Sequence, residues 1–207
     1  MQNIRVLGID PGLTRCGVGI VDVAADRSAV LVDVVVIRTP PELALERRLL
    51  AIGTGIDELL DRWAPHAVAL ERVFAQHNLR TVMGTAQASG IALHAAARRG
   101  LAVGLHTPSE VKAAITGYGA ADKKQVQTMV ARVLGLTEVP RPADAADALA
   151  IAICHAWKRS GSGTAASGTV SSGTVSSGTA ASTPAQDAWR AAERAAARPS
   201  GTRRLSG

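Results

Sequence analysis

Three apolar, β-branched segments follow one another at the start of the chain, separated only by short turns. They span residues 4–9, 18–24 and 29–38, and a Pro/Gly turn joins the first to the second. Strands that are joined by short turns pair as antiparallel neighbours. The spacing therefore predicts a three-stranded antiparallel meander, and the rest of the chain must cover the faces of that sheet.

After the meander, helical and strand-like segments alternate. Apolar residues recur at helical spacing from residue 41, where Pro41 suits a first helical turn. A second expected helix is rich in Ala and Gly, which would let a partner helix approach closely. The elements expected in this part are helix 41–63, strand 66–71, helix 78–99, strand 101–108 and helices near 109–115, 122–134 and 144–158. We therefore predict an α/β fold, with a mixed five-stranded sheet and helices on both faces.

The composition changes abruptly after Arg159. A Ser/Gly/Thr repeat runs from Ser162 to Ala181, and such a segment cannot bury enough apolar surface to offset the cost of ordering its backbone. We expect a folded domain at residues 1–159 and a disordered tail at 160–207. The tail is arginine-rich and contributes to the formal net charge of +6, which is compatible with a polyanionic partner but is weak evidence for one.

Cysteine content and hydropathy limit the cellular context. The 2 cysteines, Cys16 and Cys154, are too few for a disulfide framework and are expected to be reduced thiols. The first residues lack the basic and apolar regions of a signal peptide. No apolar run reaches the ~18 residues that a membrane span requires. We therefore expect a soluble, cytoplasmic protein with no membrane association.

Four acidic residues stand at the ends of predicted elements. Asp10 and Glu71 each follow an apolar strand, while Asp144 and Asp147 lie one turn apart at the start of an apolar helix. Taken singly, each has an ordinary explanation as a turn cap, a surface residue or a helix cap. Neighbouring strands lie ~4.8 Å apart, so carboxylates at their ends would be close. Together the four predict a site for hard divalent cations, which can promote phosphodiester cleavage in pairs.

Four further residues are candidates for contacts with nucleic acid. Phe74 is the 1 phenylalanine of the chain and is followed by polar residues, so its ring could stack on an unpaired base rather than join the core. Lys112, Lys123 and Lys124 are three of only four lysines. They could hold phosphates near the acids, and the alternative is that they are solvated surface charges. The scattered histidines receive no assignment.

Five motifs carry a resemblance to a known family. They are GIDPG at 8–12, ERVF at 71–74, QASGIAL at 87–93, KKQVQ at 123–127 and ADAADALAIAICH at 143–155. In this order and spacing they resemble the RuvC family of bacterial Holliday-junction resolvases. The resemblance covers residues 4–158 and does not extend into the tail.

The resemblance implies an RNase H-like fold and a homodimer that makes paired, symmetric nicks in four-way DNA junctions during homologous recombination and DNA repair. It also implies RuvA and RuvB as partners. The family's catalytic and metal-binding acids fall on Asp10, Glu71, Asp144 and Asp147. These acids would hold two Mg2+ ions per subunit, with Mn2+ as the alternative ion. The family's DNA-contacting positions fall on Phe74, Lys112 and Lys123, whereas Lys124 is a candidate from the lysine pattern alone.

Three other functions are compatible with parts of the sequence. The stretch GIDPGLTRCG also resembles the first phosphate-binding turn of sugar kinases and actin-like ATPases, but no second such turn follows. Another RNase H-like nuclease, acting on RNA or an RNA–DNA hybrid, would share the fold and the acids. A non-catalytic DNA-binding protein would have no use for four acids.

Overall fold

The computed structural model describes residues 3–72 and 79–161 of the 207. The chain divides into two units, Met1–Ala165 and Ala166–Gly207, and every described residue belongs to the first. Phe74 and nearly all of the tail expected at 160–207 lie outside the described residues. Within the described part, no helix is both long and apolar enough to span a membrane.

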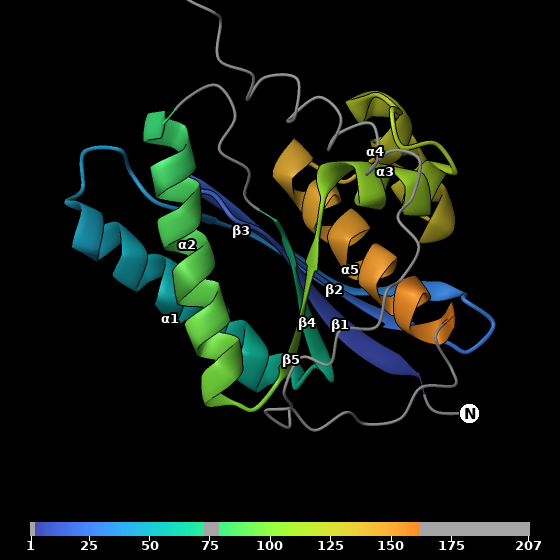
Figure 1. Ribbon diagram of the computed structural model, residues 1–207, viewed down its shortest axis with the longest axis horizontal. Coiled ribbons are helices and arrows are strands. Elements are labelled where there is room, and N and C mark those ends of the chain that lie inside the picture. Colours follow the sequence, from blue (N-terminus) through green and yellow to red (C-terminus); the bar gives the residue numbers. More distant parts are fainter. Residues whose placement is uncertain (1–2, 73–78, 162–207) are drawn as a thin grey trace, which may run out of the picture. The chain divides into compact units, whose positions relative to one another are not determined.

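One mixed sheet forms the centre of the fold, with the strand order β3-β2-β1-β4-β5 (Figure 1). The first three strands form the predicted antiparallel meander, whereas the last two run parallel to β1. The mixed five-stranded sheet expected from the sequence is thereby confirmed. The bounds are β1 (Ile4–Asp10), β2 (Arg15–Val23), β3 (Ala29–Arg38), β4 (Ala67–Glu71) and β5 (Ala102–His106).

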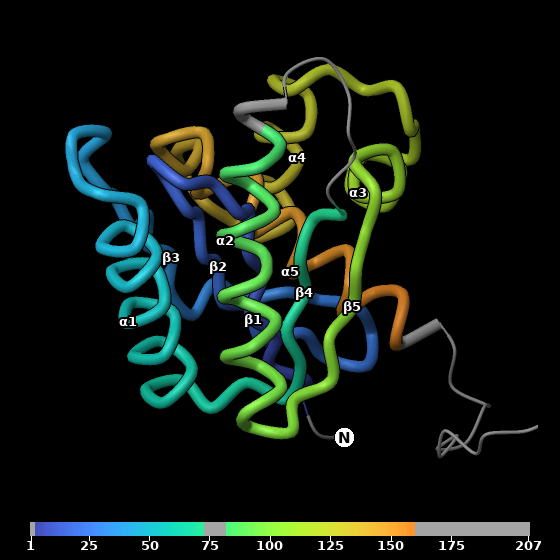
Figure 2. Tube along the Cα trace, turned by 60° about the vertical axis from the view of Figure 1, so that its left-hand side comes forward, coloured from blue at the N-terminus to red at the C-terminus, as the bar shows by residue number. Residues whose placement is uncertain are grey.

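Helices cover both faces of the sheet, as predicted (Figures 1 and 2). On one face, α1 (Leu45–Trp63) and α2 (Leu79–Arg98) lie side by side. On the other face lies α5 (Ala143–Gly161), which packs against β1 and β2 and contacts both α3 (Pro108–Thr116) and α4 (Lys123–Val133). The fold is therefore a three-layer arrangement with the sheet in the middle.

Alternation along the strands decides which side chains meet which helices. Leu7 and Ile9 belong to the core that packs under α1 and α2, whereas Val6 and Ala69 belong to the core under α5. Successive side chains of a strand point to opposite faces. By the same alternation, Asp10 lies on the α5 face of the sheet.

Glycines in β1 and β2 let α5 lie unusually close to the sheet. A Cβ atom on Gly8 would lie 2.3 Å from the carbonyl oxygen of Ala148, and one on Gly17 would lie 2.2 Å from that of Asp144. Real side chains cannot approach so closely, so only glycine fits at these positions. Since Gly17 is the cross-strand partner of Asp10, this contact places the start of α5 over the end of β1.

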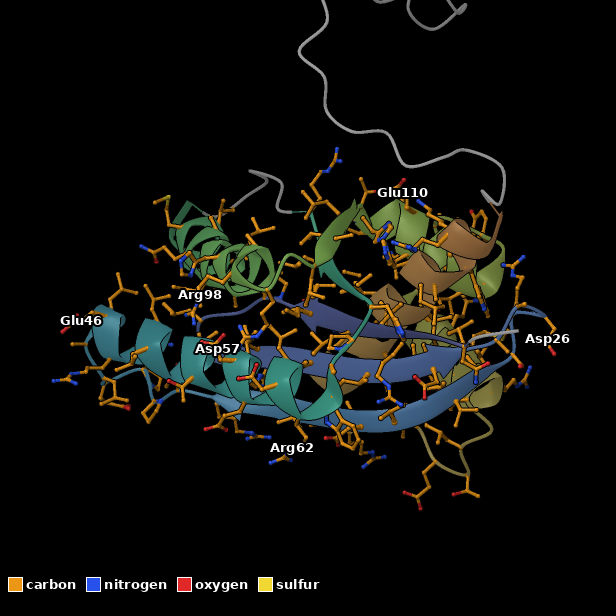
Figure 3. All side chains as sticks on the ribbon, turned by 90° about the horizontal axis from the view of Figure 1, so that it is seen from below. Asp26, Glu46, Asp57, Arg62, Arg98 and Glu110 are labelled. Carbon is orange, nitrogen blue, oxygen red and sulfur yellow. The ribbon has the colours of Figure 1, made fainter. Side chains whose placement is uncertain are left out.

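The start of the first helix differs from the prediction. We expected it at Pro41, but α1 begins at Leu45. The N–H of Leu43 donates to the carbonyl of Pro40 and closes a turn instead. Ala44 then has ψ 145°, outside helical geometry, so the turn and the helix are separate. At its other end, α1 is tied to α2 by ion pairs that include Asp57 and Arg98, 3.9 Å apart (Figure 3).

Candidate active site

Two of the four predicted acids lie at the ends of neighbouring parallel strands. Asp10 is the last residue of β1 and Glu71 the last residue of β4. Ile9 pairs with Leu70 in the parallel register, so the two acids follow side by side at the same edge of the sheet. Both lie on the α5 face by strand alternation. The strands thus bring together two carboxylates that are 61 positions apart in the sequence.

Asp10 is held in a setting that is unfavourable for its charge. Burial and, to a lesser extent, the negative charges of Asp147, Glu71 and Asp144 together raise the pKa of its carboxyl to about 7, while Lys123 opposes them. A shift with these causes indicates that the carboxylates act on one another through space that water screens poorly. The four acids predicted from the sequence therefore form one electrostatic cluster, which we call the acid cluster.

Glu71 experiences the same environment from the neighbouring strand. Burial raises the pKa of its carboxyl, and the charge of Asp147 adds to this effect. Lys123 and Lys112 act in the opposite direction. Two of the predicted DNA-binding lysines thus lie close enough to compensate part of the negative charge of the acid cluster.

Asp144 and Asp147 come from the first two turns of α5, and each contacts a cationic side chain. The Asp144 carboxylate pairs with Arg15, with 3.0 Å between Oδ2 and the Arg15 Nε. Asp147 accepts a hydrogen bond of 2.6 Å at Oδ2 from the Lys123 Nζ. Although burial opposes it, this bond raises the pKa of the Lys123 ammonium group. The helix that begins with two aspartates is therefore flanked by one cation on each side.

A cavity of about 240 Å³ adjoins the acid cluster. Its wall includes Glu71 and Asp147 together with Lys112 and Lys123. The cavity therefore combines anionic groups that suit a cation with cationic groups that suit a phosphate. This is the composition expected of a site where a phosphodiester is cleaved.

Within residues 3–72 and 79–161, no three His, Cys, Asp or Glu side chains are gathered in an arrangement that could hold a metal ion. Two of the four carboxylates point instead to Arg15 and Lys123. The chemistry of the donor set nevertheless fits a hard cation, because carboxylate oxygens are its preferred ligands. The pKa values of Asp10 and Glu71 are raised by burial first and by neighbouring carboxylates second, so a bound cation would stabilise the ionised form of both acids.

The remaining predicted DNA-binding residues are placed differently. Lys124 lines a separate cavity, with Tyr118 and Arg132, and does not share the cavity of Lys112 and Lys123. Phe74 lies outside the described residues. Its predicted contact with an unpaired base therefore stays a prediction.

A histidine pair behind the acid cluster was not anticipated. His106 Nε2 and His155 Nδ1 are 3.0 Å apart, and His106 is the strand partner of Glu71. Both rings are buried, and their other nitrogens have no hydrogen-bond partner among the described residues. Burial lowers the pKa of both rings, to about 4 for His155. No local pattern could have shown this pair, because its members are 49 positions apart.

Arg15 was also missed. It stands at the start of β2 on the same face as Gly17, and the sequence offers no sign that it meets Asp144 across the turn. In the sequence it is one arginine among many in a basic chain. Only the placement of α5 on Gly17 reveals the contact.

Comparison with known proteins agrees with this geometry. The family described as "Crossover junction endodeoxyribonuclease RuvC" matches residues 6–155. A protein of that name from Leifsonia xyli subsp. xyli is 71% identical over 99% of this chain and 100% of its own length. Another, from Clavibacter michiganensis subsp. michiganensis, is 64% identical over 93% of this chain and 98% of its own length.

Solved structures resemble the described fold as well. T. thermophilus RuvC in complex with Holliday junction substrate has a TM-score of 0.73 and 39% identity, over 76% of this chain and 95% of that chain. A yeast mitochondrial Holliday junction resolvase, at 15% identity and a TM-score of 0.56, covers 77% of this chain and 82% of its own, and shows likeness of fold alone.

Proposed function

The chain belongs to the crossover junction endodeoxyribonuclease RuvC family, and from this premise we propose that it resolves four-way DNA junctions by paired, symmetric nicks in homologous recombination and repair. It is an endonuclease, a hydrolase of phosphodiester bonds. The observation that carries the proposal is the convergence of Asp10, Glu71, Asp144 and Asp147 in one electrostatic cluster beside two lysines. We also propose a cytoplasmic location.

Members of this family are metal-dependent nucleases. We assign metal binding to the four acids and propose two Mg2+ ions per subunit, with Mn2+ as the alternative. When bound, such ions neutralise charge on the phosphate and polarise its oxygens. Asp10 lies at the centre of the proposed site, since the other three carboxylates all act on it. The protein contributes positioning, because α5 and the sheet fix the carboxylates before substrate arrives.

Lys112 and Lys123 support DNA binding from the cavity wall. A lysine ammonium that faces a phosphate holds the strand in register without reading its sequence. Lys124 would contact DNA at a separate place, beside Tyr118 and Arg132. Phe74 follows Glu71 by three residues, and we propose that its ring stacks on a base at the crossover.

Two opposed nicks require two active sites, and we propose a homodimer that forms through α2. Residues at helical spacing on this helix face solvent, and Met83 and Leu93 are 57% and 37% exposed. The stripe that they define consists of Met83, Ala86, Gly90, Leu93 and Ala97. Small and apolar side chains at this spacing suit close contact with a second helix.

RuvA and RuvB are proposed as partners on family membership alone.

The decisive experiment compares a synthetic four-way junction with linear duplex and with an RNA–DNA hybrid, each with Mg2+ and with EDTA. We expect nicks at symmetric positions of the junction, only when Mg2+ is present. Cleavage of the hybrid instead would support the proposed role of the acid cluster but would show that the substrate is an RNA–DNA hybrid. Tight junction binding without any cleavage would leave a DNA-binding protein.

Variants of the acids connect the activity to the site. Asp144→Asn and Glu71→Gln should abolish nicking and leave junction binding intact, because they remove negative charge and no phosphate contact. The matched control is Glu138→Gln, which removes an exposed carboxylate from a loop beyond α4. Normal nicking by the Asp144→Asn or Glu71→Gln protein would contradict the assignment.

A further inference from the structure

A second cavity, of about 330 Å³, borders the acid cluster at Asp144 and is lined by Arg15 and Arg48 rather than by the lysines. Asp144 belongs to its wall, whereas Asp147 belongs to the wall of the cavity that holds Lys112 and Lys123. The two aspartates at the start of α5 thus each border a different cavity. The proposed cleavage site would lie between the two.

Two arginines supply the positive charge of this second cavity. Arg15 comes from the start of β2, and Arg48 from the first turn of α1. The side chain of Arg15 is 56% exposed, so its guanidinium lies at the mouth of the cavity. It pairs with Asp144 on one side, at 3.0 Å.

Arg48 is fixed in place by hydrogen bonds. Its Nε donates to the Thr39 hydroxyl over 2.9 Å, and its Nη2 donates to the Thr14 hydroxyl over 2.8 Å. The Thr39 hydroxyl in turn donates to the carbonyl of Leu13. A guanidinium carries more N–H groups than these two bonds use, and its planar fork suits phosphate oxygens. Arg48 is thereby preorganised beside the turn that follows Asp10.

We propose that Arg15 and Arg48 form a binding subsite for a phosphate of the DNA backbone, and that Arg15 turns from Asp144 to this phosphate when a divalent cation takes over the Asp144 carboxylate. This inference rests on the proposed function. The DNA strand would run from the lysines, across the acid cluster, to the arginines. One strand would then be held on both sides of the bond that is cut.

The exchange follows from the charges in the site. Without a bound metal ion, the Asp144 carboxylate attracts Arg15 and repels a phosphate. A divalent cation bound to the same carboxylate competes with Arg15 and removes the repulsion. The free guanidinium then finds an anionic partner in the DNA backbone. Metal binding and DNA binding should therefore reinforce each other on this side of the site.

The test is the salt dependence of junction binding by the full chain, measured with Ca2+ and with EDTA on junctions checked to be uncut. Each phosphate contact adds about 0.9 to the slope of log affinity against log salt. With Ca2+, Arg15→Gln should lower the slope of log affinity against log salt by about 1. The loss of affinity between 50 and 200 mM salt should then be smaller than that of wild type by a factor of roughly 3.5. In EDTA, where Asp144 holds Arg15, the same variant should change the slope little.

Arg48 is tested with a pair of variants. With Ca2+, Arg48→Ala should lower the slope by about 1. Arg48→Lys keeps the charge and should therefore retain most of the wild-type slope. Equal losses in the two variants would show that Arg48 acts only by supporting the turn. Arg62→Ala is the matched control, because it removes an exposed arginine from the opposite end of α1, as the positions of Glu46 and Arg62 in Figure 3 show.

The outcomes separate this inference from the proposed function. If wild-type protein neither binds nor nicks the junction, the proposed function fails. If wild type does both and Arg15→Gln has the wild-type slope with Ca2+, the phosphate subsite is overturned and the function stands. If Arg15→Gln lowers the slope equally with Ca2+ and with EDTA, the exchange between Asp144 and phosphate is overturned.

Discussion

Replacing Asp10 with Asn should stabilise the metal-free protein, although it removes a proposed catalytic group. The pKa of Asp10 is raised from 3.8 to about 7 by burial and by the other three acids. A group whose pKa is raised by folding holds its proton more tightly in the native state. Stability is then lost as pH rises through the interval between the unfolded and folded values. At 1.36 kcal/mol per unit, a shift of roughly 3 units corresponds to about 4 kcal/mol.

The assay is urea unfolding in EDTA at several pH values, with wild type and Asp10→Asn compared at each. Asparagine is neutral throughout, so the variant avoids the loss. The stability difference in its favour should grow by about 2–3 kcal/mol between pH 5 and pH 8. Taking the difference between the two proteins cancels the titration of other groups, including the buried histidines. Adding Mg2+ should reverse the order, because the ions bind the native wild type more tightly.

Two controls make the result interpretable. Glu138→Gln should follow wild type at every pH, since Glu138 is exposed and is not among the charges that shift the pKa of Asp10. A difference between wild type and Asp10→Asn that is the same at pH 5 and pH 8 would refute the reasoning. So would a variant that is less stable than wild type at pH 8 in EDTA.

Three further predictions concern the surroundings of the acid cluster. Gly17→Ala should lower the free energy of unfolding by about 1–3 kcal/mol and slow nicking, because its Cβ would lie 2.2 Å from the Asp144 carbonyl oxygen. Urea unfolding measures the first effect and junction nicking the second. The histidine pair should make the metal-free protein less stable as pH falls from 6.5 towards 4, because burial lowers the pKa of both rings. His155→Leu should remove most of this loss of stability in the same unfolding assay. Phe74→Ala should slow nicking and leave metal affinity unchanged, as measured by ion titration of the DNA-free protein; unchanged nicking would count against stacking.

The sequence predicts most of the fold because its elements have clear local signals. The β-branched runs mark the meander, and helical periodicity marks all five described helices. The predicted start of α1 was wrong because Pro41 satisfies the rule for a first helical turn, whereas the chain forms a separate turn from Pro40 to Leu43. Ala44 then has ψ 145°, outside helical geometry, so the helix begins only after it.

The site was predictable only in part. The acids were found because each stands at the end of an element, where strand geometry brings distant residues together. The ion pairs of Asp144 and Asp147 were not, because Arg15 and Lys123 come from other elements, and only the packing of α5 aligns them. Contacts of this kind depend on the relative placement of helices, which periodicity does not specify.

The magnitudes decide what the two aspartates at the start of α5 are for. An acidic residue in a first helical turn stabilises the helix by about 0.3–1 kcal/mol. Burial, and then the charges of Asp147, Glu71 and Asp144, raise the pKa of Asp10 to about 7, and the combined shift corresponds to a cost of several kcal/mol at neutral pH without a cation. Helix capping therefore cannot account for the arrangement. The deep burial of Leu149, Ile151 and Ile153 on the same helix offsets that cost, so α5 is held in place by its apolar part while its first turns present charge to the proposed metal site.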